Sequence, residues 1–450
     1  MNLCVIGTGY VGLVSGVCFA ELGNKVICVD IEEEKIRNLN NGIMPIYESD
    51  LEDICNRNRQ EGRIEFTTSL EHGVKNSEII FIAVGTPSLP NGQADLSAVE
   101  AVATDIAKYM NGYKIIVNKS TVPVGTQKWV TQIIKDNQRQ KHDFDVVSNP
   151  EFLREGTAVY DTMNTDRVVI GSVSHKASKI MTELHEPFNA PVIITDPESA
   201  EMIKYAANAF LATKITFINE IANICEKVGA DVKEVAKGIG LDRRISNRFL
   251  EPGVGYGGAC FPKDTKAIVK IGEKVGYDFE VVKSVIRVNE KQKLRPFKKL
   301  EKALGTIEGK RVGILGLSFK PNTDDMREAP SIDIICAIQN AGGTVKAYDP
   351  IAMDGAQNIL RNVEYANTPY DAVKDVDAVI LVTEWKEFEQ LDLKRVKDLV
   401  KGNIFIDGRN VFNYTEMKKL GFEYYCIGRR DDEYYKHYLK EVAITALENH

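Results

Sequence analysis

Residues 2–12 read Asn-Leu-Cys-Val-Ile-Gly-Thr-Gly-Tyr-Val-Gly, a short apolar run that passes directly into three glycines with the spacing Gly-x-Gly-x-x-Gly. The apolar run predicts a buried strand, and the glycines predict a tight turn from that strand into a helix. A second apolar run, KVICV at 25–29, ends at Asp30. A strand, a glycine turn, a helix and an acidic residue after the next strand are typical of a Rossmann-type βαβ unit.

Each glycine of this turn has a separate physical role. Gly7 allows the tight turn, Gly9 lets the backbone approach a pyrophosphate at the helix N-terminus, and Gly12 lets helix and strand pack closely. Asp30 can accept hydrogen bonds from an adenosine ribose and would repel a 2′-phosphate, which favours NAD over NADP. A glycine turn in a fold that binds another ligand is the alternative, and the strand and helix context argues against it.

The alternation of strands and helices extends outward from this unit. Apolar, β-rich runs recur to about Thr195, and a similar alternation restarts at Lys310, where VGILG echoes CVIGTG. The segment between them has helical periodicity and contains one long helix, apolar on all faces, which we expect to join domains or subunits. We predict an α/β protein with two Rossmann-like doubly wound domains joined by a helical middle domain with one long central helix, divided as 1–196, 197–304 and 305–450.

Composition excludes several classes of protein. The chain has 450 residues, of which 44% are hydrophobic and 27% charged, so it is neither disordered nor collagen-like. Its 57 Lys and Arg against 64 Asp and Glu give a net charge of −7, which provides no overall positive field for nucleic acid. We expect no membrane span and no secretion signal, and therefore a cytoplasmic protein. Eight cysteines without a CxxC pair and six scattered histidines predict no disulfide scaffold and no metal site.

Polar motifs follow three further strand candidates. Gly85-Thr86-Pro87 follows IIFIAV, Ser120-Thr121-Val122-Pro123 follows IIVN, and NPEFLREG at 149–156 follows DVVS. Because the carboxyl ends of parallel strands meet at one edge of a sheet, these motifs can line a ligand crevice. Ser, Thr and Pro are also common turn residues, and the two carboxylates Glu151 and Glu155 can form a solvated acidic turn instead of supplying a general base.

The helical middle carries two features that suit covalent chemistry. Lys204 and Asn208 share a face of the long apolar helix, where they suit stabilisation of an alkoxide or, alternatively, a structural salt bridge. GVGYGGACFPKD at 253–264 is a glycine-rich loop that runs into a helix with Cys260 near its first turn. The helix N-terminus and Lys263 predict a lowered pKa for the Cys260 thiol, and only the thiolate is a good nucleophile. Asp264 follows one turn later on the same face.

Together these motifs resemble the nucleotide-sugar dehydrogenases, the family that oxidises UDP-glucose, GDP-mannose or N-acetylmannosamine nucleotides. The motifs GTGYVG, GTP, STVPVGT, NPEFLREG, KYAANAFLA, GVGYGGACFPKD and FKPNTDDMREAPS occur in the family's order and span nearly the whole chain. The resemblance implies an NAD-dependent, four-electron oxidation of UDP-glucose to UDP-glucuronate through a thiohemiacetal and a thioester on Cys260. The same mechanism on UDP-N-acetylmannosamine or GDP-mannose is the alternative within the family.

The resemblance also implies roles for individual residues. Cys260 would be the nucleophile, and the alkoxide, oxyanion and attacking water would be handled by Lys204, Asn208, Asp264, Glu151 and Thr121. NAD would be held by Gly7, Gly9, Tyr10, Val11, Gly12, Asp30, Lys35, Thr86, Pro87, Thr121, Glu155, Lys263 and Arg327. The sugar nucleotide would be held by Glu151, Phe152, Leu153, Arg154, Lys204, Asn208, Arg244, Phe249, Leu250, Gly253, Tyr256, Gly257, Phe319, Lys320 and Arg409, with Arg244 reaching the substrate of the partner subunit. The family dimerises through the long helix, so we expect a homodimer.

Two functions of other kinds stay open at the level of sequence. A two-electron dehydrogenase acting on a small alcohol or hydroxy acid would form one NADH per product, and Cys260 would then be structural. A non-catalytic dinucleotide sensor would leave NAD unchanged and would have no need of Lys204, Asn208 and Cys260. Counting NADH per sugar consumed separates these possibilities.

Overall fold

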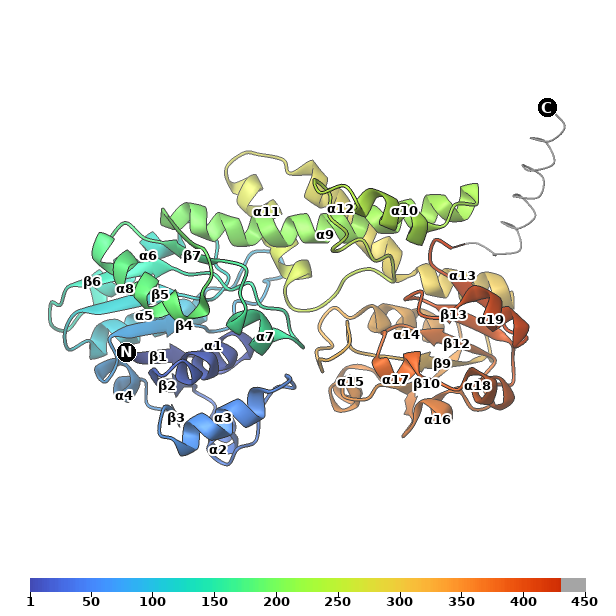
Figure 1. Ribbon diagram of the computed structural model, residues 1–450, viewed down its shortest axis with the longest axis horizontal. Coiled ribbons are helices and arrows are strands. Elements are labelled where there is room, and N and C mark those ends of the chain that lie inside the picture. The colour runs from blue at the N-terminus through green and yellow to red at the C-terminus, as the bar shows by residue number, and fades with distance from the viewer. Residues whose placement is uncertain (430–450) are drawn as a thin grey trace. The chain divides into compact units, whose positions relative to one another are not determined.

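The computed structural model describes residues 1–429, which fall into two compact units. Unit 1 comprises Met1–Asn208 and Lys263–Phe279, and unit 2 comprises Ala209–Pro262 and the chain from Glu280 onward. Each unit is built on one sheet (Figure 1). The predicted division at residues 197 and 305 stays a prediction, and the last 21 residues of its third segment, 430–450, lie outside the described residues.

The sheet of unit 1 has eight strands in the order β3-β2-β1-β4-β5-β6-β7-β8. The strands are β1 (Asn2–Ile6), β2 (Lys25–Val29), β3 (Ile64–Thr67), β4 (Ile79–Ile82), β5 (Lys114–Asn118), β6 (Phe144–Ser148), β7 (Val168–Gly171) and β8 (Val192–Thr195). Only the β6–β7 pair is antiparallel among these described strands. The edge strand β3 was not predicted, because its four residues alternate between buried and more exposed positions.

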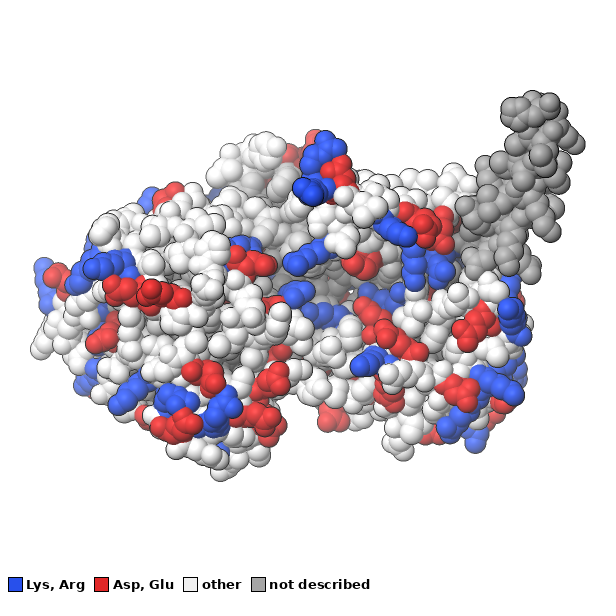
Figure 2. Space-filling model, viewed as in Figure 1, with Lys and Arg blue, Asp and Glu red and all other residues white. Residues whose placement is uncertain are grey.

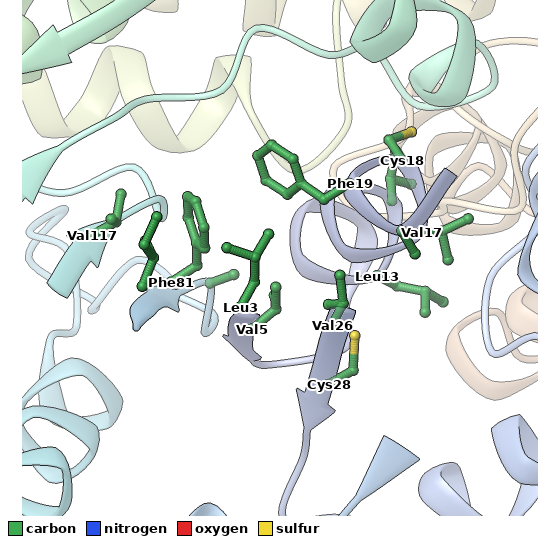
Figure 3. Close-up of a cluster of buried hydrophobic side chains, with 14 of the residues drawn as sticks. Leu3, Val5, Leu13, Val17, Cys18, Phe19, Val26, Cys28, Phe81 and Val117 are labelled. Atoms are coloured by element: carbon green, nitrogen blue, oxygen red, sulfur yellow. The ribbon is translucent and has the colours of Figure 1, made fainter. Parts of the chain in front are cut away.

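Helices cover both faces of this sheet. One face carries α1 (Tyr10–Glu21), α2 (Glu33–Asn40), α3 (Leu51–Gln60), α7 (Ala158–Met163) and α8 (His175–His185). The other face carries α4 (Leu70–Lys75), α5 (Ser97–Tyr109) and α6 (Thr126–Asn137). Figure 3 shows part of the first core, to which β1 contributes Leu3, β4 contributes Phe81, and α1 contributes Leu13 and Phe19. The Phe19 and Phe81 rings are 5.2 Å apart.

The sheet of unit 2 has six parallel strands in the order β11-β10-β9-β12-β13-β14, the same order as the first six strands of unit 1. They are β9 (Arg311–Leu315), β10 (Thr344–Tyr348), β11 (Val363–Tyr365), β12 (Ala378–Leu381), β13 (Ile404–Asp407) and β14 (Glu423–Cys426). α13 (Arg295–Leu304), α14 (Pro330–Asn340) and α15 (Met353–Ile359) pack on one face. α16 (Pro369–Val373), α17 (Lys386–Glu389), α18 (Leu393–Leu399) and α19 (Tyr414–Lys419) pack on the other. The predicted fold class, with two Rossmann-type sheets, is confirmed.

The two sheets repeat one local device, as the echo of CVIGTG in VGILG predicts. In unit 1, Gly7 N donates to Val29 O at 2.8 Å, and Asp30 accepts from the backbone just after that glycine. In unit 2, Gly316 N donates to Tyr348 O at 2.8 Å, and Asp349 accepts from the next backbone N–H at 2.7 Å. In both units a carboxylate after the second strand therefore fixes the turn after the first.

Along the chain, the helices that follow β8 and precede β9 are α9 (Pro197–Val228), α10 (Val232–Gly240), α11 (Phe261–Lys274), α12 (Glu280–Lys293) and α13. The 32-residue helix α9 is the long helix that the sequence predicts. Its buried face includes Ile218 and Ala222, whereas Phe210, Phe217, Ile224 and Val228 are more than half exposed in the single chain. The helical chain is interrupted just before Pro296: α12 ends at Lys293 and α13 begins at Arg295. A proline is tolerated in the first turn of a helix but not in its interior.

Charge is mixed over the surface of each unit. On the face drawn in Figure 2, acidic and basic side chains are interspersed among uncharged ones. In the described part of the chain, no helix combines the length and apolarity that crossing a membrane requires. Residues 1–429 also contain no group of three or more side chains arranged to hold a metal ion.

Candidate active site

The glycine turn after β1 has the geometry that a dinucleotide needs. Gly7 has a φ of +99°, and a Cβ there would lie 2.6 Å from Ala83 O. A Cβ at Gly12 would lie 1.9 Å from Gly7 O, so α1 packs directly on the turn. A Cβ at Gly9 would meet nothing within 4 Å, and no side chain of the described residues caps α1 there. Open space at an uncapped helix N-terminus suits the pyrophosphate of NAD, and Tyr10 and Val11 form the first turn of that helix.

Asp30 holds the glycine turn in place. Its Oδ2 accepts from Thr8 N at 2.8 Å and from Thr8 Oγ1 at 2.7 Å, and its Oδ1 accepts from Glu32 N at 3.2 Å. Lys35 Nζ lies 3.2 Å from Oδ2. Burial raises the pKa of Asp30, but the hydrogen bonds from Thr8 and Glu32 and the charge of Lys35 outweigh it and keep the pKa below its usual value. The predicted ribose acceptor is therefore ionised and oriented.

The loops after β4 and β5 are tied to each other. Thr86 Oγ1 donates to Thr121 O at 2.9 Å, and Ser120 Oγ donates to Val84 O at 2.6 Å. Thr86 is buried, whereas Pro87 is exposed beside it. The structure thus brings these two predicted cofactor loops together at the carboxyl edge of the sheet, at the position where doubly wound sheets bind ligands.

Glu151 and Lys204 form a buried ion pair. Lys204 Nζ lies 2.7 Å from Glu151 Oε1, and the other oxygen of Glu151 accepts from Leu153 N at 2.9 Å. The Lys204 ammonium also lies 5.6 Å from the centre of the Phe152 ring. The neighbouring Arg154 points elsewhere: it is exposed and pairs with Asp161 at 2.7 Å, while Glu155 is buried. The carboxylate and ammonium predicted from separate motifs therefore meet in one desolvated cluster.

A second buried contact joins α9 to α11. Asn208 Nδ2 donates to Asp264 Oδ2 at 2.6 Å, and Lys263 Nζ lies 2.6 Å from Asp264 Oδ1. Asp264 is fully buried. Both carboxylate oxygens are thus held, which fixes the position of a group that can accept a proton from a water molecule.

Two further buried residues near the Glu151–Lys204 pair, Glu201 and Lys119, were not singled out from the sequence. Glu201 lies one turn before Lys204 on the same face of α9 and accepts from Gly125 N at 2.7 Å and Gln127 N at 2.9 Å, so it caps α6. Burial raises the pKa of Glu201, and these hydrogen bonds oppose the shift. Lys119, the residue after β5, donates to Asn149 Oδ1 at 3.0 Å. The signals in the sequence were a third polar residue on the helix face of Lys204 and a lysine at the end of an apolar strand.

In unit 2 the glycine-rich loop is held by buried amides. Asn289 of α12 accepts from Tyr256 N at 2.8 Å and donates to Tyr256 O at 3.0 Å. Asn219 of α9 accepts from Gly253 N at 2.8 Å, and Gln292 Nε2 donates to Gly253 O at 2.7 Å. These three amide side chains were not predicted from the sequence. They fix the backbone that precedes the predicted nucleophile.

Close packing explains the later glycines of this loop. A Cβ at Gly257 would lie 2.3 Å from Glu328 O. Gly258 has a φ of +83°, and a Cβ there would lie 2.7 Å from the Phe319 ring. The loop and Phe319, a predicted substrate residue, are therefore direct neighbours.

Cys260 is partly exposed and directly precedes the first residue of α11. It is the last residue but two of its segment of unit 2, and Lys263 and Asp264 of unit 1 follow it along the chain. Among the other cysteines, Cys336 is exposed, and the remaining six, Cys4, Cys18, Cys28, Cys55, Cys225 and Cys426, are buried. Burial raises the pKa of Cys4 and Cys18 to about 12, so these thiols are inert.

The other predicted substrate residues of unit 2 form two groups. Tyr256 and Phe249 pack against Phe261, with ring centres 5.9 and 6.4 Å away, and Leu250 is buried nearby in the sequence. Arg409 Nη2 donates to Phe319 O at 3.0 Å, and Lys320 Nζ lies 5.5 Å from the Phe319 ring centre. These contacts bring Phe319, Lys320 and Arg409 together.

Two predicted arginines lie apart from these groups. Arg327 is exposed and pairs with Asp325 at 2.7 Å. Arg244 pairs with Asp242 at 2.6 Å, and its side chain is 89% exposed. Each of these arginines therefore pairs with the aspartate two residues before it in the sequence.

Comparison with known proteins agrees with this geometry. Residues 1–189 match the UDP-glucose/GDP-mannose dehydrogenase family, NAD binding domain; 198–291 match its central domain, and 313–414 its UDP binding domain. UDP-glucose 6-dehydrogenase TuaD of Bacillus subtilis is 55% identical over 95% of this chain and 93% of its own length. A UDP-glucose dehydrogenase structure from Pyrobaculum islandicum has a TM-score of 0.90 at 37% identity, covering 95% of this chain and 98% of that one.

A more distant structure has the same fold over nearly the same length. It is a UDP-D-ManNAc dehydrogenase from Pyrococcus horikoshii, which has a TM-score of 0.84 at 28% identity and covers 95% of this chain and 99% of that one. With a glycine turn that suits a dinucleotide, a buried carboxylate–lysine pair and all three family domains in order, the chain belongs to the UDP-glucose/GDP-mannose dehydrogenase family.

Proposed function

We propose that this protein is a UDP-glucose 6-dehydrogenase that oxidises UDP-glucose to UDP-glucuronate in two NAD-dependent steps. The observation that carries the proposal is α11, which begins directly after the Cys260 thiol and carries the buried Asp264 that Asn208 holds at 2.6 Å. A thiol four residues before a buried carboxylate that an amide holds in place suits covalent capture of an aldehyde and later hydrolysis. A two-electron alcohol dehydrogenase or a sensor has no need of this arrangement.

Bound NAD would supply the hydride acceptor for both oxidations. Gly7, Gly9 and Gly12 leave room for its pyrophosphate at the start of α1, and the ionised Asp30 offers an acceptor for the ribose. The remaining cofactor contacts that we propose are Tyr10, Val11, Lys35, Thr86, Pro87, Thr121, Glu155, Lys263 and Arg327.

The chemistry at C6 is assigned to residues of both units. Lys204 and Asn208 stabilise the alkoxide as the alcohol becomes an aldehyde, and the Cys260 thiolate adds to that aldehyde to give a thiohemiacetal. The second oxidation converts this adduct to a thioester. A water held by Glu151, Thr121 and Asp264 attacks the thioester carbonyl, and the C–S bond breaks to release the acid and the thiolate.

The UDP moiety is assigned to unit 2, with Phe319, Lys320 and Arg409 around the nucleotide. The sugar pocket is assigned to the glycine loop and to the segment after β6, namely Glu151, Phe152, Leu153, Arg154, Phe249, Leu250, Gly253, Tyr256 and Gly257. The match of 313–414 to a UDP binding domain supports the nucleotide. Relatives that act on UDP-glucose support glucose over an N-acetylated sugar.

A homodimer through α9, in the cytoplasm, completes the proposal. Phe210, Phe217 and Ile224 repeat every seven residues and are 66%, 53% and 54% exposed in the single chain. Such an apolar stripe on a long helix is typical of an interface between helices. Arg244, exposed in unit 2, would reach the substrate of the partner. Sedimentation analysis of the wild type and Phe217→Asp tests this: the variant is expected to sediment as a monomer.

The decisive experiment offers UDP-glucose, UDP-N-acetylmannosamine and GDP-mannose with NAD and counts NADH per sugar consumed. Two NADH and one UDP-glucuronate per UDP-glucose are expected. One NADH per product would instead support a two-electron dehydrogenase. Unchanged NAD with all three sugars would support a sensor, and turnover of another sugar alone would move the protein to a different branch of the family.

A further inference from the structure

Lys119 places a second ammonium group inside the buried cluster that contains Glu151 and Lys204. It follows the last residue of β5, and its side chain is buried. Its Nζ donates to Asn149 Oδ1 at 3.0 Å. Asn149 is itself 1% exposed and donates through Nδ2 to Val169 O at 2.8 Å. That second bond fixes the amide, so its oxygen points at the Lys119 ammonium.

The charges around Lys119 do not balance. Lys119, Asn149, Glu151, Asp161, Arg167 and His185 line one cavity of unit 1. Glu151 is paired with Lys204 at 2.7 Å, and Asp161 is paired with Arg154 at 2.7 Å. Within residues 1–429, no carboxylate lies within ion-pair distance of Lys119. The Glu151–Lys204 pair is neutral as a unit, so the Lys119 ammonium beside it is a positive charge that no carboxylate at ion-pair distance neutralises.

The other groups that face Lys119 do not remove this excess. His185 Nδ1 of α8 donates to Met181 O at 2.7 Å, and burial together with the Lys119 charge lowers the pKa of His185 to about 3, so it is neutral at pH 7. Arg167 at the start of β7 adds a cation, stacked 3.6 Å from the centre of the Phe152 ring. Burial lowers the pKa of Lys119 to about 8, with Glu151 opposing and Lys204 adding to the shift.

A buried ammonium without a carboxylate partner destabilises a fold, and a neutral side chain of similar length would avoid the penalty. The same charge favours nearby anions, because its field is weakly screened in a desolvated cluster. Resting on the proposed function, we propose that Lys119 is a positioning residue for the reaction: its ammonium, fixed on Asn149, adds positive charge beside the Glu151–Lys204 pair and favours the anionic states of the bound sugar. Lys119 acts through Glu151 and the field of the site, and it makes no contact with the reacting carbon in this assignment.

The test compares Lys119→Gln with Lys119→Arg and with a matched control on the same strand. Lys114 begins β5 at the opposite edge of the sheet, is also buried, and donates to Ser77 O at 2.5 Å. Each full-length variant is assayed with UDP-glucose and NAD for kcat between pH 6 and 9, for NAD affinity and for thermal midpoint, beside the wild type. The wild type must form two NADH per sugar, so a failure of the proposed function is seen separately.

The expected result for Lys119→Gln is a fall in kcat of about tenfold or more and an acid limb of the pH profile displaced upward, because the anionic states of the site lose a favourable charge. Its thermal midpoint should stay the same or rise, because a buried unpaired charge is gone. Lys119→Arg should keep the wild-type acid limb even where kcat falls, and Lys114→Gln should keep both the acid limb and kcat.

Three results would overturn the assignment. The first is a Lys119→Gln variant with the wild-type kcat and pH profile. The second is a Lys119→Gln variant that loses stability along with activity, since the ammonium would then act as a structural group. The third is an equal displacement of the acid limb in Lys114→Gln, which would make the effect one of overall charge.

Discussion

The ammonium of Lys204 lies 2.7 Å from a carboxylate oxygen of Glu151, and the two side chains are only 4% and 5% exposed. Removing two charges from water is costly, and the pair is tolerated because Leu153 N satisfies the second Glu151 oxygen at 2.9 Å. Each partner therefore depends on the other, since either charge alone would be buried without compensation. Stability and catalysis are consequently linked at this pair.

A double-mutant cycle measures that dependence. Glu151→Gln leaves the Lys204 ammonium without its carboxylate, and we expect a loss of about 3–5 kcal/mol in the free energy of unfolding. Lys204→Met should lose a similar amount, whereas the double variant should recover most of it because no charge is left unpaired. Urea denaturation measures the three variants, all of which should be nearly inactive. Losses that simply add in the double variant would show that the two charges are independent.

The glycine turn separates a folding role from a binding role. In Gly12→Ala the new Cβ would lie 1.9 Å from Gly7 O, so α1 must move away from β1, and we expect a loss of more than about 3 kcal/mol in stability. In Gly9→Ala the new Cβ meets no atom of the chain within 4 Å, so stability should stay within about 0.5 kcal/mol of wild type.

Gly9→Ala, which should keep the stability of the wild type, is expected to lose affinity for the cofactor. The Gly9→Ala methyl group occupies the space through which a pyrophosphate approaches α1, and we expect the Kd for NAD to rise about tenfold or more. Calorimetric titration with NAD measures this. Normal NAD affinity in Gly9→Ala would mean that the pyrophosphate does not lie at this helix N-terminus.

The motifs that could be found from the sequence are those whose partners are close in the chain. The Gly7 to Gly12 turn, the buried strands and the break at Pro296 each follow from a few adjacent residues. The strands that escaped prediction, β3 and β14, are edge strands of four residues with alternating exposure, which gives no continuous apolar run. The strand predictions that failed were therefore both at sheet edges, although the edge strand β8, which ends at Thr195, was predicted.

Contacts between distant residues explain what was missed at the site. Glu201 bonds a residue 76 positions away, Lys119 one that is 30 away, and Asn289 one that is 33 away. Only the folded sheet and helices bring these groups together, and single polar residues of this kind look like ordinary surface residues in a sequence. Their roles became visible once their burial and partners were known.

His185 makes the stability of unit 1 sensitive to acid. Burial and the charge of Lys119 lower its pKa from 6.5 to about 3. Between these pH values the unfolded state binds more protons than the folded state, so stability present above pH 6.5 is lost as the pH falls toward 3. This difference in the pKa of His185 corresponds to a loss of roughly 5 kcal/mol in the free energy of unfolding.

His185→Leu removes this titration. We expect the free energy of unfolding of the variant to fall less between pH 7 and pH 4 than that of the wild type, by about 2–3 kcal/mol. Urea denaturation at both pH values gives the difference. Parallel losses in variant and wild type would mean that other groups account for the acid sensitivity.

Asn289 is expected to control the substrate loop without affecting the cofactor. Asn289→Leu leaves the buried N–H and C=O of Tyr256 without partners, and we expect a loss of about 2–4 kcal/mol in stability. The KM for UDP-glucose should rise and kcat should fall, while the Kd for NAD stays at the wild-type value because α12 carries none of the proposed cofactor contacts. The exposed Asn358→Ala is the matched control, expected within about 0.5 kcal/mol of wild type. A change in NAD affinity in Asn289→Leu would argue against separate roles.

Cys260→Ser tests the covalent step directly. A serine hydroxyl keeps the size of the side chain but supplies no thiolate, so the aldehyde cannot be held as a thiohemiacetal for the second oxidation. We expect unchanged NAD affinity, at most one NADH per sugar and no UDP-glucuronate, measured by absorbance and by chromatography of the products. Cys336→Ser, at an exposed thiol of α14, is the control and should form two NADH per sugar. UDP-glucuronate made at the wild-type rate by Cys260→Ser would exclude Cys260 as the covalent nucleophile.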